Sequence, residues 1–186
     1  RANNIQPGTN TLVDGFSQDV VYQDGRNEQD IEAQGGLLRL EYDLGNAMLT
    51  SLTAFETLEM YSRGDIDGGY GASFLGEGNY GPGFIPFPSE SADGIPDLDQ
   101  LTQEIRVASD LGGAFDWLAG VFYFSEELQV DSFSYDTLAP GNPQNGYALQ
   151  KQDAESWAVF GSLTYHPSEV WDLTAGLRFT SDEKDF

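Results

Sequence analysis

Hydrophobic and polar residues alternate along several stretches of the chain, and the clearest example is ESWAVFGSLTYH at 155–166. At a period of two, one face of this stretch carries Trp157, Val159, Gly161, Leu163 and Tyr165. The other face carries Ser156, Ala158, Phe160, Ser162, Thr164 and His166. Such alternation is typical of a β-strand whose two faces meet different surroundings. A period of two does not by itself tell an apolar face in a protein core from one in lipid.

The same alternation predicts an all-β chain with about six antiparallel strands in three hairpins. The expected order is a polar loop region at 1–34, with one strand near Val20 to Tyr22, then hairpins at 35–60, 101–125 and 153–186, separated by loops at 61–100 and 126–152. The pair Gly45-Asn46 predicts the tight turn of the first hairpin. Residues 61–100 are rich in glycine, proline and acidic residues, which predicts a long loop. The face assignment of strand 47–60 stays open, because neither of its faces is clearly the apolar one.

The connections between the strands are unequal in length. Short turns at 45–46, 110–114 and 166–170 alternate with the two long loops. Outer-membrane barrels have short turns at the periplasmic end and longer loops outside, whereas a soluble meander has no reason to keep this order. The longest apolar run, WLAGVFYF at 117–124, is far shorter than the roughly 20 residues of a membrane-spanning helix. The pattern therefore favours an up-and-down transmembrane β-barrel segment.

Three arginines help to assign the faces. Arg39, Arg106 and Arg178 each lie in the middle of a predicted strand, on the face opposite the aliphatic residues. An arginine at the lipid midplane would cost about 2–4 kcal/mol, so this second face is expected to be wet or paired. From Trp157 to Tyr165 a tilted strand rises by roughly 20 Å, close to the apolar band of about 25 Å in such barrels. The aromatic residues expected at the two lipid interfaces are Tyr42, Trp117, Trp157, Tyr165 and Trp171.

A soluble all-β module is the alternative hypothesis, with a sandwich core in place of lipid. Phe115 to Phe124 supports it, because both faces of this stretch are apolar, as in a fully buried strand. Such a module would be secreted or surface-exposed and would bind carbohydrate or calcium. In a barrel, the apolar second face of this strand would need a packing partner inside the barrel.

Charge and composition narrow the class of partner. The chain has 8 basic and 31 acidic residues, a net charge of −23, which repels nucleic-acid phosphates and anionic lipid headgroups. No nucleic acid is therefore expected as a partner. The chain has no cysteine, which excludes disulfides and cysteine nucleophiles. Because it starts at Arg1 without a signal segment, we expect a fragment or a mature piece of a longer protein.

Residues that could support chemistry are few, and we expect neither an enzyme nor a cofactor. The one histidine, His166, precedes a proline in a predicted turn, so a Ser-His-Asp site would depend on a single exposed ring. Two acidic stretches are weak calcium candidates, although a solvated acidic loop is the more usual explanation; their residues are Asp65, Asp67, Asp93, Asp97 and Asp99. Aromatic residues of the long loop either contact a ligand or form the packing of the loop itself: Tyr70, Phe74, Tyr80, Phe84 and Phe87.

Five stretches in succession resemble the barrel strands of TonB-dependent outer-membrane receptors. They are LTSLTAF at 49–55, TQEIRVAS at 102–109, WLAGVFYF at 117–124, SWAVFGSLTY at 156–165 and LTAGLRFT at 173–180. Each motif alone has low specificity, but the five occur in the order of the family, with its short turns and long loops. The resemblance covers Gly35 to Thr180 and does not include residues 1–34.

The resemblance implies a segment of a large barrel in the bacterial outer membrane, typically of 22 strands, with a plug domain in its lumen. The plug would belong to the same full-length protein and would pack against Leu118, Phe122 and Phe124. The residues expected on the lumen side, in contact with the plug or paired with one another, are Arg39, Glu104, Arg106 and Arg178. The implied partners are the plug, the TonB energy-coupling complex, outer-membrane lipid and a transported ligand. The implied function is uptake of a bulky, scarce nutrient such as a ferric siderophore, with cobalamin, an oligosaccharide or another metal chelate as alternatives.

Overall fold

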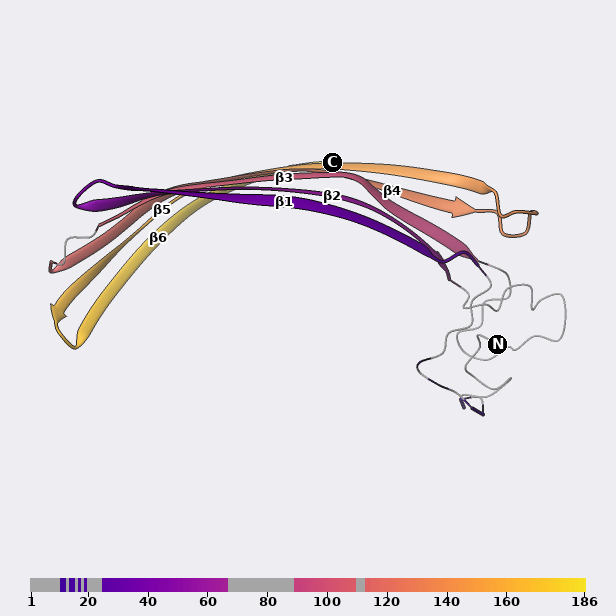
Figure 1. The fold of residues 1–186 in the computed structure, drawn as a ribbon, viewed down its shortest axis with the longest axis horizontal. Helices are drawn as coiled ribbons and strands as arrows, with labels where there is room; N and C mark the ends of the chain where they lie inside the picture. The colour runs from indigo at the N-terminus through magenta and orange to yellow at the C-terminus, as the bar shows by residue number, and fades with distance from the viewer. Residues whose placement is uncertain are drawn as a thin grey trace. The chain divides into compact units, whose positions relative to one another are not determined.

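The computed structural model describes residues 25–66, 89–109 and 113–186, together with residues 11, 12, 14, 15, 17 and 19. Its long elements are six β-strands, and these residues contain no helix. The strands are β1 (Glu28–Asp43), β2 (Ala47–Asp65), β3 (Glu90–Ser109), β4 (Phe115–Tyr135), β5 (Gln144–Ser168) and β6 (Trp171–Asp185). They form one sheet in the order β1-β2-β3-β4-β5-β6, so each strand lies beside its neighbours in sequence (Figure 1). The prediction of an all-β, up-and-down, antiparallel segment of six strands is confirmed.

The strands are longer than the sequence predicts at the ends that lead to the long loops. β1 begins at Glu28, inside the region expected to be loop. β2 runs to Asp65 and β3 begins at Glu90, both inside the loop predicted at 61–100, and the loop predicted at 126–152 shortens to 136–143. Polar residues occupy both faces of these extensions, so the alternation that marks a strand in the sequence is missing there, although the backbone ladder continues. The strand expected near Val20 to Tyr22 lies outside the described residues.

The tight turn predicted at Gly45-Asn46 is confirmed. The Leu44 amide donates to the Ala47 carbonyl, and the Gly45 amide donates to Asp43 Oδ1. Gly45 has a φ of +86°, a conformation that residues with a Cβ rarely adopt. The turn predicted at 166–170 is shorter than expected, because β5 runs to Ser168. A register irregularity between Tyr165 and Ser168 accommodates Pro167, which has no amide to donate to the ladder.

The chain divides into two compact units. The first consists of Arg1–Glu32, Glu59–Pro96 and Val130–Gln150, and the second of Ala33–Leu58, Asp97–Gln129 and Lys151–Phe186. Both long connections, 66–89 and 136–143, belong to the first unit. All three short connections, 44–46, 110–114 and 169–170, belong to the second unit. Short and long connections are therefore separated, as the sequence predicts.

The pairing of β5 with β6 in the second unit produces one apolar and one more polar face. Opposite one another on the apolar face are Val159 and Phe179, Gly161 and Leu177, Leu163 and Ala175, and Tyr165 and Leu173. The other face pairs Phe160 with Arg178, Ser162 with Gly176 and Thr164 with Thr174. Side-chain contacts agree with this division, since the Trp157 and Phe179 rings lie 5.5 Å apart and the Thr164 and Thr174 hydroxyls 2.9 Å apart.

The face assignment of β2, which the sequence leaves open, follows from two contacts in the second unit. The Phe55 ring lies over Gly36 of β1, and Gln103 of β3 bonds both Ser51 and Thr53. By alternation, these residues share a face with the aliphatic side chains Leu38, Leu40, Leu101 and Ile105. The pattern is hard to see in sequence because three polar residues interrupt the apolar face. The hydrogen bonds of Gln103 with Ser51 and Thr53 reduce the free-energy cost of placing these polar side chains on the apolar face.

Few side chains are buried among the described residues. The buried apolar residues are three alanines, Ala92, Ala154 and Ala158. Large apolar side chains are exposed instead, with Leu177 at 87%, Trp171 at 66% and Phe179 at 63% of their full accessibility. Water-soluble monomers rarely expose apolar surface on this scale. The apolar face is therefore expected to be covered by something other than this sheet.

Candidate functional site

On the second face of the second unit, an arginine lies near two aromatic rings. Arg178 on β6 lies opposite Phe160 on β5. Its guanidinium carbon is 5.3 Å from the ring centre of Phe122 on β4 and 5.6 Å from that of Phe160, and its Nε donates to Thr180 Oγ1 at 3.1 Å. Rings at this distance attract a cation through their negative faces. We call Phe122, Phe160 and Arg178 the Arg178 site.

A glycine makes room for the Arg178 site. A Cβ added to Gly120 would lie 2.5 Å from the ring of Phe160, closer than any real Cβ contact. The missing side chain therefore lets this ring lie against the backbone of β4. Both faces of this strand are apolar in the sequence, and the ring of Phe160 covers part of the second one.

The other arginines predicted on the second face have acidic partners on their own strands. Arg106 Nη1 lies 3.3 Å from Glu104 Oε1, and Arg39 pairs with Glu41. The four residues predicted to face the lumen are therefore not joined into one ion-pair network among the described residues. Of the three predicted arginines, Arg178 alone has no carboxylate within ion-pair distance in the described part of the chain.

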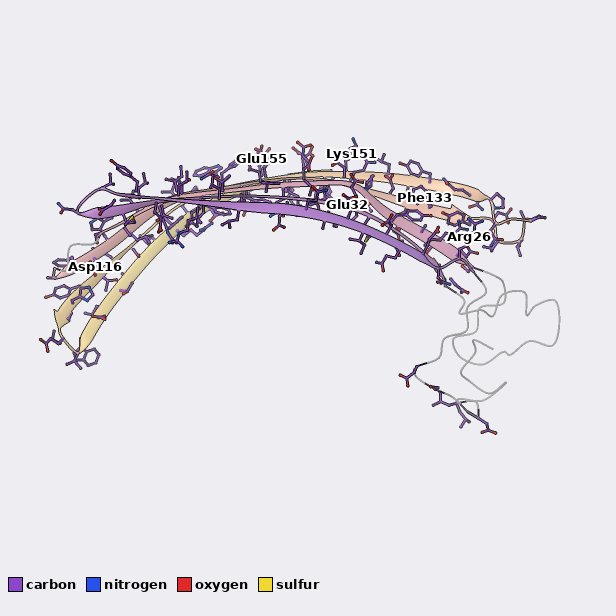
Figure 2. All side chains as sticks on the ribbon, viewed as in Figure 1. Arg26, Glu32, Asp116, Phe133, Lys151 and Glu155 are labelled. Atoms are coloured by element: carbon purple, nitrogen blue, oxygen red, sulfur yellow. The ribbon has the colours of Figure 1, made fainter. Side chains whose placement is uncertain are left out.

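His166 connects three strands in the second unit. Its Nε2 lies 2.8 Å from Asp116 Oδ2 on β4, and its Nδ1 lies 2.7 Å from Asp172 Oδ1 on β6 (Asp116 is labelled in Figure 2). The Ser109 hydroxyl donates to Asp116 Oδ1 from β3. The expectation of an exposed ring in a turn is wrong, because β5 continues past His166 and brings the ring between two hairpins.

This arrangement, which we call the His166 bridge, favours a charged ring. A neutral imidazole has one N–H, so it cannot donate to both carboxylates, whereas an imidazolium can. Hydrogen bonds to Asp172 and Asp116 raise the pKa of His166 above its usual value. With both nitrogens engaged, and with Ser109 bonded to an aspartate and not to the ring, the group has no free base to activate a nucleophile. The signal in the sequence is weak, because Asp116 is 50 positions from His166, and Asp172, six positions away, lies on the other strand of the hairpin.

The first unit contains a buried ion pair near the ends of β2 and β3. Arg63 Nε and Nη2 donate to Glu90 Oε2 at 2.8 and 2.6 Å, and the two side chains are only 6% and 4% exposed. Asn142 Nδ2 donates to the other oxygen, Glu90 Oε1, at 2.6 Å. The guanidinium carbon lies 3.7 Å from the ring centre of Tyr135, whose hydroxyl contacts that of Tyr61 at 3.1 Å.

These five residues, the Arg63 cluster, satisfy one another. Burial opposes the charge of Arg63, but the hydrogen bonds and negative charge of Glu90 outweigh it and raise the pKa of Arg63 further. Burial and the hydrogen bond with Tyr61 raise the pKa of Tyr135, so its hydroxyl stays protonated at neutral pH. Asn142 reaches Glu90 from a left-handed backbone conformation with φ of 48°, which asparagine tolerates. The sequence pattern misses the cluster because it places Arg63 and Glu90 in a loop.

A shallow groove of about 260 Å³ lies within the first unit. Tyr61 and Phe133 form its aromatic part, with ring centres 6.1 Å apart (Phe133 is labelled in Figure 2). Its acidic lining consists of Asp30, Glu32, Glu59 and Asp131. The groove combines aromatic surface with negative charge and would repel an anion.

The calcium candidates do not gather into a site. Among the described residues, no three His, Cys, Asp or Glu side chains are placed to hold a metal ion. Asp93, Asp97 and Asp99 lie along β3, where neighbouring side chains on one face are about 7 Å apart, too far to share an ion without another strand. Asp93 accepts from Ser132, and Asp65 from the Gly25 amide. Asp67 lies outside the described residues.

The aromatic residues predicted to contact a ligand, Tyr70, Phe74 and Tyr80, lie outside the described residues, as do Phe84 and Phe87. The predicted girdle residues are described and are all exposed: Tyr42, Trp117, Trp157, Tyr165 and Trp171. Tyr165 stacks on Phe115 with ring centres 4.8 Å apart.

Carboxylates lie directly opposite one another beyond Trp157. In the β5–β6 register, Glu155 pairs with Glu183, and Asp153 pairs with Asp185. Tyr123 donates a hydrogen bond to Glu155. Like charges in opposite positions of a sheet destabilise it.

Comparison with known proteins identifies the family. No helix among the described residues is long and apolar enough to cross a membrane. No curated protein matches the chain. The family model described as "TonB dependent receptor-like, beta-barrel" matches residues 1–186, so the chain belongs to this family of outer-membrane, TonB-dependent transport proteins.

Proposed function

We propose that this chain forms part of the barrel wall of an outer-membrane receptor that takes up a ferric siderophore. In this proposal the apolar face contacts lipid, and the second face contacts a plug domain of the same full-length protein. TonB acts on that plug from the periplasm. The chain performs no bond-making chemistry of its own.

The observation that carries the proposal is the register of β5 and β6. It puts four apolar pairs on one face, and side chains there such as Leu177 and Phe179 stay mostly exposed. Hydrocarbon is a suitable covering for such a face, since a barrel alternates apolar residues outward with polar residues inward. Trp157 and Tyr165 then mark the two lipid interfaces, with Tyr42, Trp117 and Trp171 near the short turns.

The second face supports contact with a plug. Arg39, Glu104, Arg106 and Arg178 are charged residues that hydrocarbon would reject. Leu118, Phe122 and Phe124 lie on the same face of β4 and need a protein surface to pack on. A lumen filled by protein meets both needs, because it offers polar partners as well as apolar contact.

The choice of a ferric siderophore as cargo rests on family membership, since receptors of this kind import nutrients that are scarce and bulky. Among the described residues, no group of His, Cys, Asp or Glu side chains is placed to hold a metal ion. The structure therefore gives no support to the alternative of a calcium-binding module.

The orientation of the faces is tested by a cysteine scan from Trp157 to Tyr165 in the full-length receptor in outer membranes. This chain contributes no native cysteine to the background. Odd positions are expected to react only with a lipid-soluble thiol reagent, and even positions with a water-soluble reagent or with neither. Odd positions that react with neither reagent, in a protein that stays soluble without detergent, would overturn the proposal.

The cargo is tested separately, by growth of a receptor-deletion strain under iron limitation. Individual ferric siderophores are supplied with and without the receptor gene. Growth restored by one siderophore only when the gene is present supports the proposed cargo. Restored uptake of cobalamin or an oligosaccharide alone would replace the cargo and keep the transport function.

A further inference from the structure

We propose that the groove of the first unit binds a small organic cation, a quaternary ammonium ion such as choline. Residues of β1, β2, β3 and β4 line the groove, and two of them, Glu32 and Phe133, are labelled in Figure 2. The inference goes beyond the proposed function, because it involves neither the plug nor the siderophore.

The groove has room for one small group and not for a ferric siderophore. Its volume is about 260 Å³, below the roughly 300–1,000 Å³ of sites that enclose drug-sized ligands. A Cβ added to Gly94 would lie 3.8 Å from the Phe133 ring and 3.9 Å from Asp131 Cβ. It would also lie 3.4 Å from the Met60 carbonyl oxygen, so all three contacts are at ordinary distances. The glycine therefore leaves a hollow that a ligand can fill.

Aromatic rings form one wall of the groove. The ring centres of Tyr61 and Phe133 are 6.1 Å apart and the ring planes are inclined by 64°, so the two rings present surfaces at an angle. The Tyr147 ring lies 5.4 Å from that of Phe133. The Tyr61 hydroxyl contacts that of Tyr135 at 3.1 Å, which helps to fix the Tyr61 ring. A quaternary ammonium ion packs its methyl groups against ring faces of this kind, which attract positive charge.

Negative charge surrounds this wall, and none of the described residues that line the groove is basic. Among the described residues, Asp30 and Glu59 take part in no ion pair. Arg63 of the same unit is paired with Glu90 and does not neutralise them. The carboxylates of the groove repel one another, so a bound cation would relieve that repulsion. The complete acidic lining is Asp30, Glu32, Glu59 and Asp131.

The spacing of these carboxylates favours an organic ion over a metal ion. Calcium and magnesium need several oxygen atoms gathered around one point. No three acidic or histidine side chains in the described part of the chain are placed in that way. A quaternary ammonium ion has no hydrogen to donate and needs no such cage, because the attraction of its charge to carboxylates acts over a longer distance. Its methyl groups also match the aromatic wall, which a hydrated metal ion does not.

The test measures the binding of choline to the full-length receptor in detergent, by saturation-transfer NMR of the choline methyl groups. The receptor is expected to bind choline but not its neutral isostere, in which carbon replaces the nitrogen. Gly94→Ala puts a methyl group into the hollow and should remove the binding. Gly64→Ala is the matched control in the same unit, because its added carbon meets only Asn27, at 3.9 Å. Phe133→Leu removes one ring and should weaken binding about two- to fivefold, the fold-change of an exposed cation–π contact.

Each other outcome overturns the inference. Equal binding of the neutral isostere would mean that the groove recognises apolar shape alone. Binding that survives Gly94→Ala would place the choline elsewhere, and binding that Gly64→Ala also removes would not depend on filling the groove. Displacement of choline by an equal concentration of Ca²⁺, or stronger binding of butylammonium, would assign the groove to a metal ion or to a lysine side chain of a partner. No binding of choline, by a receptor that still supports siderophore-dependent growth, would leave the proposed function intact and the groove without this ligand.

Discussion

Arg63 in the first unit and Arg178 in the second both lie against aromatic rings, but they differ in what balances their charge. Arg63 is buried, and Glu90, Asn142 and Tyr135 surround it. Arg178 is exposed and has two rings but no carboxylate among the described residues. A buried charge needs partners within the fold, because an unpaired charge away from water is strongly destabilising. Water can solvate an exposed charge instead. The Arg63 cluster therefore balances its charge within the fold, whereas the exposed Arg178 is accessible to solvent.

The largest expected effect comes from breaking the Arg63 cluster. Arg63→Met leaves the Glu90 carboxylate buried without its cation, which costs about 3 kcal/mol, the lower end for a buried pair. Hydrogen exchange in the full-length receptor should show faster local opening of the ends of β2 and β3. The Arg63→Met/Glu90→Met double variant should recover most of the loss, because no charge is left unpaired. Equal losses in the single and double variants would mean that the loss does not come from leaving the Glu90 charge unpaired.

A smaller effect is expected at the glycine below the Arg178 site. Gly120→Ala forces a methyl group against the ring of Phe160, and crowding of this kind costs about 1–3 kcal/mol. Local hydrogen exchange in β4 and β5 measures the loss. Gly113→Ala is the matched control, since nothing lies within 4 Å of the added carbon. If the two variants behave alike, the ring is free to move and the site is less ordered than its geometry indicates.

The His166 bridge differs from both arginine sites because its charge depends on pH. Its two aspartates raise the pKa of His166, so the folded protein holds the proton more tightly than the unfolded chain. The stability from the bridge is therefore complete below about pH 6.5, the usual histidine pKa, and is lost as pH rises through the folded pKa. Hydrogen exchange near the β5–β6 turn should speed up across this range beyond the intrinsic effect of pH. His166→Gln should remove that extra dependence, and a wild-type profile without it would contradict the charged bridge.

The sequence predicts the repeating strands well but predicts the ion pairs poorly. Strands such as β6 could be predicted because alternation survives wherever the two faces meet different surroundings. The ends of β2 and β3 could not, because polar residues on both faces remove that alternation. Arg63 and Glu90 are 27 positions apart, and the sequence pattern places both in one loop, so it does not reveal that they pair. His166, Asp116 and Asp172 meet only through the pairing of three strands, a register that sequence periodicity does not determine.

The smallest effect is expected for a change of charge on β6. This change tests whether the opposed carboxylates of β5 and β6 are balanced within the sheet or by a cation from outside it. Glu183 lies directly opposite Glu155, so the two carboxylates repel. Glu183→Lys replaces this repulsion with an opposite-charge pair and should stabilise the local structure by about 0.2–1 kcal/mol. Hydrogen exchange in β6 at low ionic strength measures the gain, and added salt should reduce it because these charges are exposed. Ser181→Lys is the matched control, since Trp157 stands opposite that position in place of a carboxylate. A loss of stability in the Glu183→Lys variant alone would mean that a cation from outside already balances the two glutamates.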